Sequence, residues 1–122
     1  MINLKTQVGI IGAGPAGLTL ALWLKKQGIS SVIIEHRSRE YVEARVRAGL
    51  LEQNTVDIMT DLGVADRLKK EGQEHHGVYL SFNGDRIRVP FGELTGGRNI
   101  TIYGQQEVVK DLTNEWLRGG ET

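Results

Sequence analysis

The chain has 122 residues, its 15 lysines and arginines balance 15 aspartates and glutamates, and it contains no cysteine. This length allows at most one small domain. The missing cysteines rule out disulfides, thiolate catalysis and cysteine-based zinc sites, and the zero net charge gives no electrostatic reason to expect a nucleic acid or a membrane surface as partner. We therefore expect a small cytoplasmic domain.

Residues 8–28 predict a strand, a turn and a helix. "VGIIG" is a short β-branched run of the kind that lies buried in a parallel sheet. The helix begins at Pro15 and ends before Gly28, and its buried stripe comprises Leu18, Ala21 and Leu22. A membrane or secretory segment is the alternative, but the run is shorter than the ~20 residues that a bilayer requires, contains four glycines and a proline, and has no cleavage site after it.

Gly12, Gly14 and Gly17 form the pattern G-x-G-x-x-G. In a dinucleotide site these glycines allow a tight turn, a close approach of the backbone to a diphosphate, and close packing of the helix on the strand. The free N–H groups of the helix also favour an anion there. A second strand, "SSVIIE", ends in Glu35, eighteen residues after Gly17, where such folds place the carboxylate that binds a ribose. Together these signals predict a Rossmann-like β-α-β unit.

The stretch "HRSREYVEARVRAG", residues 36–49, is interpreted as a basic connector. Arg45 and Arg47 alternate, so in an extended segment both point to one side. Two guanidinium groups on one side can clamp phosphates through bidentate hydrogen bonds. The alternative is a solvated loop with ordinary surface arginines.

The remaining helices and strands are predicted from changes in the spacing of the apolar residues along the chain. We expect a helix from about Leu50 to Leu62, a short helix within 64–72 and a β-hairpin over 78–91 that turns at "NGD". A loop at 92–99, a strand at 100–103 and a helix carrying Val108, Leu112 and Trp116 come last. We expect the strands at 8–12, 31–35 and 100–103 to share one sheet layer.

Four stretches of the chain resemble the N-terminal part of the flavoprotein aromatic hydroxylases in order and spacing: "VGIIGAGPAGLTLALWLKKQGISSVIIE", "RVRAGLLEQNTVDIM", "HHGVYLSFNG" and "TIYGQQEV". Within them, "R-x-R-A-G-x-L-E-Q" and "Y-G-Q-x-E-V" are far more specific than the glycine pattern. The resemblance implies an α/β fold, a Rossmann-like FAD-binding β-α-β unit plus a β-hairpin that is incomplete relative to the family fold. Residues 1–122 would then be a partial FAD-binding domain, the N-terminal fragment of a longer monooxygenase.

The resemblance also implies FAD as cofactor. Glu35 would bind the ribose, Arg47 would face the pyrophosphate and Gln105 the flavin side. The full set of implied FAD contacts is Gly12, Gly14, Ala16, Gly17, Glu35, Arg45, Val46, Arg47, Ala48, Gly49, Leu50 and Gln105. His36, Arg37 and Tyr41 occupy the positions that select the nicotinamide donor, and the first two depart from the family's residues, so both NADPH and NADH stay open.

The implied reaction is hydroxylation of a phenolic acid beside its hydroxyl group, with NADPH and O₂. The resemblance places His75 at the end of a proton relay from the phenol to solvent, and an ordinary histidine pKa near ~6.5 suits that role. His76 beside it could share the role, and a surface histidine is the simpler interpretation.

Two other functions stay open at this point. The chain could belong to a different FAD- or NAD-dependent oxidoreductase that shares only the adenosine half of the site, or it could be a non-catalytic nucleotide-binding or self-associating module. The family's second flavin motif and its substrate-binding residues are not found in the sequence. We therefore expect the chain alone to bind FAD weakly at best, to be inactive, and to form a homo-oligomer through the exposed edge and apolar face of an incomplete sheet.

Overall fold

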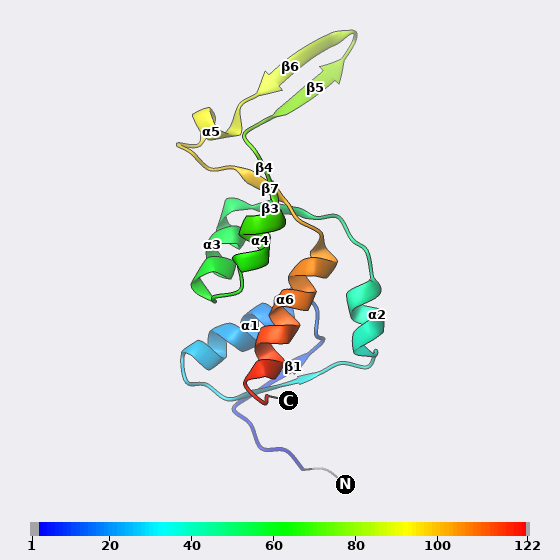
Figure 1. Cartoon of the computed structure of the whole chain (residues 1–122), viewed down its shortest axis with the longest axis vertical. Coiled ribbons are helices and arrows are strands. Elements are labelled where there is room, and N and C mark those ends of the chain that lie inside the picture. Colours follow the sequence, from blue (N-terminus) through cyan, green and yellow to red (C-terminus); the bar gives the residue numbers. More distant parts are fainter. Residues whose placement is uncertain (1–2, 122) are drawn as a thin grey trace.

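The computed structural model describes residues 3–121 and begins with the predicted β-α-β unit (Figure 1). Strand β1 (Val8–Ile11) pairs in parallel with β2 (Ser31–Ile34), with Ile10 opposite Ile33. Between them in sequence lies α1 (Pro15–Lys26), whose buried residues are the predicted Leu18, Ala21 and Leu22. These residues and Ile10 belong to the hydrophobic core, which confirms the predicted fold of this unit.

Helix α1 ends as the sequence predicts. Gly28 has a φ of 73°, a left-handed conformation that glycine adopts without steric cost. Its N–H donates to the carbonyl of Lys25 at 3.0 Å, and the N–H of Ile29 donates to the carbonyl of Leu24 at 2.9 Å. These two bonds satisfy carbonyl groups that the helix end would leave free.

The last helix, α6 (Gln105–Arg118), packs against α1 and completes the core. Val108, Leu112 and Trp116 are buried as predicted, and Val109 is buried with them. No helix within residues 3–121 combines the length and the apolar character needed to cross a membrane.

The predicted connector at 36–49 is partly wrong, because it contains a helix, α2 (Arg39–Ala44). The Oγ atom of Ser38 caps this helix by accepting the N–H of Tyr41 at 3.2 Å. Arg39 holds α2 against α6 by donating to the side-chain oxygen of Asn114. None of the residues of α2 is buried, so the helix produces no apolar periodicity in the sequence.

The expected single sheet layer is also wrong. Strand β7 (Ile100–Ile102) lies between β3 (Leu50–Glu52) and β4 (Gln73–His75) in a separate antiparallel sheet. Its backbone groups pair with these two short strands instead of with β1 or β2. The helix expected from Leu50 therefore begins only at α3 (Gln53–Asp61), because the three residues before it pair with β7.

The predicted hairpin consists of β5 (Val78–Phe82) and β6 (Asp85–Val89), and it projects away from the helices (Figure 1). Asn83 and Gly84 both have positive φ values, 51° and 80°, which is typical of a type I′ turn. The second strand stops at Val89. Phe91, expected in that strand, instead begins the short helix α5 (Phe91–Leu94) after Pro90. The short helix expected within 64–72 is α4 (Asp66–Glu71).

Candidate functional site

The glycine turn between β1 and α1 is open on one side and tightly packed on the other. A Cβ atom built on Gly12 or Gly14 meets nothing within 4 Å, so a ligand can approach this backbone. A Cβ atom on Gly17 would collide with the carbonyl oxygen of Gly12 and lie 3.2 Å from Cγ2 of Ile10. Gly17 therefore allows α1 to pack directly on β1, as the glycine pattern predicts.

Glu35 follows β2 and faces the same turn. Its Oε2 accepts the N–H of Ala13 at 3.0 Å, and its Oε1 accepts the N–H of Arg37 at 2.9 Å. These bonds hold the pKa of Glu35 below its ordinary value, so the side chain is ionised at neutral pH. The ring nitrogen Nδ1 of His36 lies 3.2 Å from Oε1. Each carboxylate oxygen keeps a further lone pair that can accept a hydroxyl of a ribose.

A cleft of about 520 Å³ opens beside the glycine turn. Arg37, Arg45 and Arg47 give its wall a positive character, while Glu35 provides an acceptor for hydroxyl groups. The cleft brings together eight of the residues predicted for cofactor binding: Gly14, Glu35, His36, Arg37, Tyr41, Arg45, Arg47 and Gln105.

A second, largely apolar cleft of about 610 Å³ lies between α1 and α3. Its walls contain three more of the predicted residues, Ala16, Ala48 and Leu50, whereas Gly12, Gly17, Val46 and Gly49 line neither cleft. Pro15 and Gln105 line both clefts, so the two adjoin each other at the N-terminus of α1. A polar, positively charged cleft that continues into an apolar one suits a ligand with a diphosphate in the middle and an aromatic ring at one end.

Residues 45–50 contribute to the walls of both clefts, and the end of this segment is held by the residues that follow β7. The carbonyl of Gly49 accepts the N–H of Tyr103 at 2.8 Å. A Cβ atom on Gly49 would lie 2.7 Å from Cα of Gly104, so only glycine allows this close approach. Val46 is 77% exposed and lines neither cleft.

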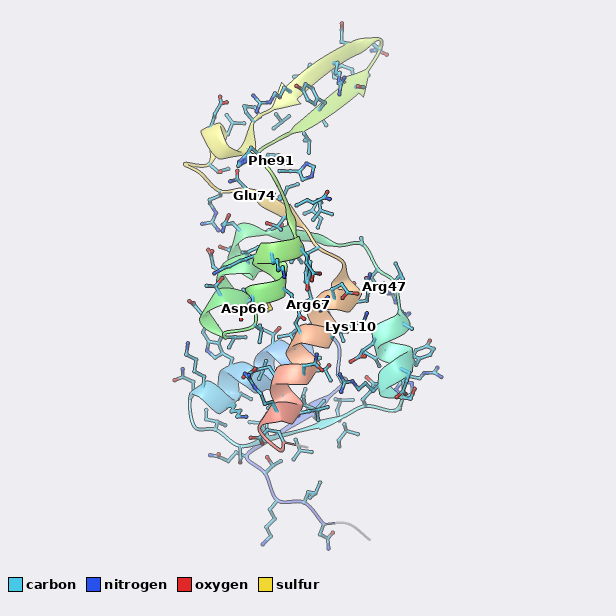
Figure 2. All side chains as sticks on the ribbon, in the orientation of Figure 1. Arg47, Asp66, Arg67, Glu74, Phe91 and Lys110 are labelled. Atoms are coloured by element: carbon cyan, nitrogen blue, oxygen red, sulfur yellow. The ribbon has the colours of Figure 1, made fainter. Side chains whose placement is uncertain are left out.

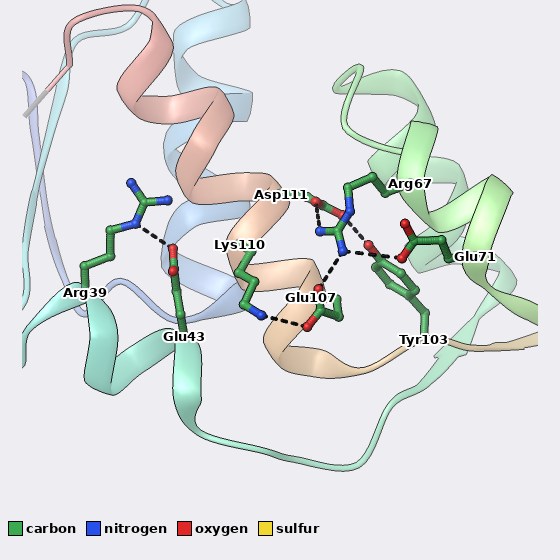
Figure 3. Close-up of polar contacts among 8 residues, drawn as sticks. All are labelled: Arg39, Glu43, Arg67, Glu71, Tyr103, Glu107, Lys110 and Asp111. Carbon is green, nitrogen blue, oxygen red and sulfur yellow. Dashed lines mark hydrogen bonds and ion pairs between the residues drawn. The ribbon is translucent and has the colours of Figure 1, made fainter.

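An ionic network fixes the first turns of α6, which carry Gln105 (Figure 3). The guanidinium of Arg67, on α4, donates to Glu107 at 2.6 Å and to Asp111 at 2.7 Å. The hydroxyl of Tyr103 donates to the other Asp111 oxygen at 2.6 Å. Figure 2 shows Arg67 between α4 and α6, with Lys110 on α6 and Arg47 beyond it.

The charges in this network stabilise one another. Glu107 and Asp111 raise the pKa of Arg67, and Arg67 together with Lys110 lowers the pKa of Glu107. Burial, and then the contact with Asp111, raises the pKa of Tyr103, so its hydroxyl keeps its proton. The network therefore ties the β7–α6 connection, and with it one wall of both clefts, to α4.

His75 lies apart from the residues described above. It is the last residue of β4, pairs with Ile100, and is exposed. It lines neither cleft. His76 follows it and accepts the N–H of Gly92 through its backbone carbonyl at 3.2 Å.

Gln106 is a cleft residue that sequence reasoning missed. It lines the first cleft, and its Oε1 atom is buried without a hydrogen-bond partner among residues 3–121. Gln106 occupies the variable position of Y-G-Q-x-E-V, next to the motif residue Gln105, so no sequence signal marks it and only the structure reveals it. An unpaired buried acceptor, three arginines and a ribose-type carboxylate on one cleft fit FAD, whose parts supply donors, phosphates and hydroxyl groups.

Comparisons with known proteins agree with this geometry. The FAD binding domain family model matches residues 5–122. The chain is 50% identical over 112 residues to p-hydroxybenzoate hydroxylase from Acinetobacter baylyi, which is 92% of this chain but only 28% of that protein. The chain thus spans less than a third of the length of this relative.

Two solved structures share the fold. One is p-nitrophenol 4-monooxygenase from Pseudomonas putida, with a TM-score of 0.80 and 22% identity over 97% of this chain and 30% of the other. The other is a tetrameric form of 2-methyl-3-hydroxypyridine-5-carboxylic acid oxygenase, with a TM-score of 0.76 and 23% identity over 93% of this chain and 29% of the other. With the family match over nearly its whole length, the chain belongs to the FAD binding domain family.

Proposed function

We propose that this chain is the FAD-binding part of an aromatic monooxygenase that hydroxylates 4-hydroxybenzoate to 3,4-dihydroxybenzoate with NADPH and O₂. The observation that carries the proposal is the 50% identity to p-hydroxybenzoate hydroxylase over 92% of the chain. Because the chain spans 28% of that relative, the residues that bind the aromatic acid would come from another part of such an enzyme.

The residues of the two clefts have distinct tasks in this proposal. The N-terminus of α1 and Arg47 bind the diphosphate, and Glu35 accepts the ribose hydroxyls. Gln105 contacts the flavin side, and the segment 45–50 that carries Arg47 contacts FAD. Bound FAD supplies electron transfer from the nicotinamide and activation of O₂. The guanidinium of Arg37 lies 4.9 Å from the ring of Tyr41, and with His36 these residues would contact the nicotinamide donor.

A chimera tests the function directly. Residues 5–122 of this chain replace the matching segment of the Acinetobacter baylyi hydroxylase, and NADPH oxidation and product formation are measured with 4-hydroxybenzoate. We expect 4-hydroxybenzoate-dependent oxidation and 3,4-dihydroxybenzoate as product. Retention of FAD without hydroxylation would contradict the proposed reaction and favour another FAD-dependent oxidoreductase.

Glu35→Ala in the same chimera separates cofactor binding from folding. Loss of hydrogen bonds to a charged group is expected to weaken FAD retention by about 1–3 kcal/mol. The flavin content after dialysis measures this effect, and Glu93→Ala, at a side chain of α5 that is 75% exposed and outside both clefts, is the control. An unchanged flavin content would remove Glu35 from the site.

His75 provides the second test in the chimera. If it ends a proton relay, His75→Asn slows substrate-stimulated flavin reduction between pH 6 and 8 and leaves FAD affinity nearly unchanged. His76→Asn is the matched control. Wild-type kinetics of the His75 variant across this range would show that the relay assignment is wrong.

We also propose that the 122-residue chain by itself forms a homo-oligomer and does not hydroxylate. The tetrameric form of a protein with the same fold supports assembly in this group of structures. Catalysis also needs a closed, dry pocket around the ring and the substrate, and the two clefts of this chain are open.

A further inference from the structure

Gln106 carries the one buried side-chain oxygen at the first cleft that has no hydrogen-bond partner among residues 3–121. The carboxamide oxygen is buried, yet no N–H or O–H among residues 3–121 donates to it. Such orphaned acceptors are rare in folded proteins, because each costs the free energy of lost hydration. Two further orphaned oxygens, on Ser31 and Asn99, do not line this cleft.

The position of Gln106 is fixed by its neighbours. It is the second residue of α6, and its carboxamide lies against the backbone of Gly104: a Cβ atom built there would come within 2.6 to 2.9 Å of the carboxamide atoms. Gly104 thus leaves the space that the carboxamide occupies. Gln106 lines the same cleft as Arg45 and Arg47, and neither guanidinium donates a hydrogen bond to its Oε1.

We propose that Gln106 is a further nucleotide-binding residue. Its Oε1 is occluded in the ligand-free chain, so the carboxamide turns about its terminal C–C bond toward the first cleft and Oε1 then accepts a hydrogen bond from the adenosine part of the bound cofactor. The inference rests on the proposed binding of FAD. A phosphate offers only acceptors at neutral pH, so it cannot satisfy a carboxamide oxygen. Adenosine offers donors, namely the ribose hydroxyls and the adenine amino group, and Glu35 on the same cleft marks the place of the ribose.

This assignment predicts effects of opposite direction on binding and on stability. Gln106→Met keeps the length of the side chain and removes the orphaned oxygen. The apo chain then no longer contains an unpaired buried acceptor, so its melting temperature stays equal to wild type or rises. The dissociation constant for FAD increases about three- to tenfold, because one neutral hydrogen bond is lost in the complex.

The experiment measures both quantities on the 122-residue chain, by calorimetric titration with FAD and by thermal unfolding without ligand. Gln27→Met, at an exposed glutamine after α1, is the control and changes neither. Unchanged FAD affinity in Gln106→Met would overturn the inference. So would weaker binding accompanied by a lower melting temperature, because that result assigns Gln106 a structural role. The same two proteins are compared in the chimera with the Acinetobacter baylyi hydroxylase. Unchanged FAD affinity of Gln106→Met there overturns this inference alone, whereas a wild-type chimera that retains no FAD contradicts the proposed function.

Titration with two nucleotides identifies the donor. ADP carries both the amino group and the ribose hydroxyls, whereas inosine diphosphate lacks the amino group. If the amino group is the donor, wild type prefers ADP and Gln106→Met loses the preference. If a ribose hydroxyl is the donor, the variant weakens both nucleotides by the same factor. Equal affinities of wild type and variant for each nucleotide would contradict the proposal.

Discussion

Gly17→Ala is expected to destabilise the chain by about 2–3 kcal/mol, within the usual range for overpacking in a rigid site. The added Cβ atom collides with the carbonyl oxygen of Gly12, which belongs to the backbone and cannot rotate away, and it presses on Ile10. The clash therefore forces α1 away from β1, opening the core around Leu18. The same shift moves the turn at Gly12 to Gly14, so FAD affinity should fall as well. Urea unfolding, followed by the helical signal, measures the effect.

Gly9→Ala is the matched control for that substitution. Gly9 lies in β1, its φ is not positive, and nothing lies within 4 Å of a Cβ atom built there. The alanine reduces the conformational freedom of the unfolded chain, so stability should be unchanged or slightly higher. Equal unfolding midpoints for the two variants would show that the glycine pattern does not reflect close packing of helix on strand.

The β-α-β unit could be predicted because its signals are local. Apolar periodicity, Pro15 and Gly28 each act within one or two turns of α1, and the structure confirms all three. The separate sheet could not be predicted in this way. Strand β3 has three residues, and its partner β7 lies about fifty residues further along the chain, so its pairing depends on long-range contacts that no local pattern reports.

The residues of the site also divide into those that local motifs predict and those that depend on long-range contacts. Glu35, Arg45 and Arg47 stand in motifs whose spacing implies a phosphate and a ribose, and the first cleft gathers them. Gln106 differs because its distinguishing property is an unpaired buried oxygen, which depends on how α6 meets Gly104. His75 was assigned through the family resemblance, and in this chain it lies on an exposed strand end. Site residues that depend on burial in the folded chain, such as Gln106, therefore cannot be predicted from a sequence motif.

The 122-residue chain is expected to self-associate through the apolar face of the hairpin. Alternation places Val78, Leu80 and Phe82 of β5 on the same face as Ile87 and Val89 of β6. Leu80, Phe82 and Ile87 are each 50–56% exposed although the hairpin projects from the body (Figure 1). A two-stranded hairpin is marginally stable in water unless its apolar face packs on another layer. A second copy supplies that layer with a self-complementary surface, so light scattering should give at least twice the monomer mass of 13.5 kDa.

Single substitutions locate the surface. Ile87→Lys puts a charge on the apolar face and should return the chain to a monomer, whereas Ser81→Lys, on the opposite face beside Arg86, should leave the oligomer intact. The outer face of the β1 and β2 pair is the competing surface, because Ile11 is 83% and Ile34 58% exposed. Ile34→Lys tests it: a monomer only in that variant would assign the interface to the β1 and β2 pair. A monomer of wild type at high concentration would contradict self-association itself, because the apolar hairpin face would then be stable in water without a partner.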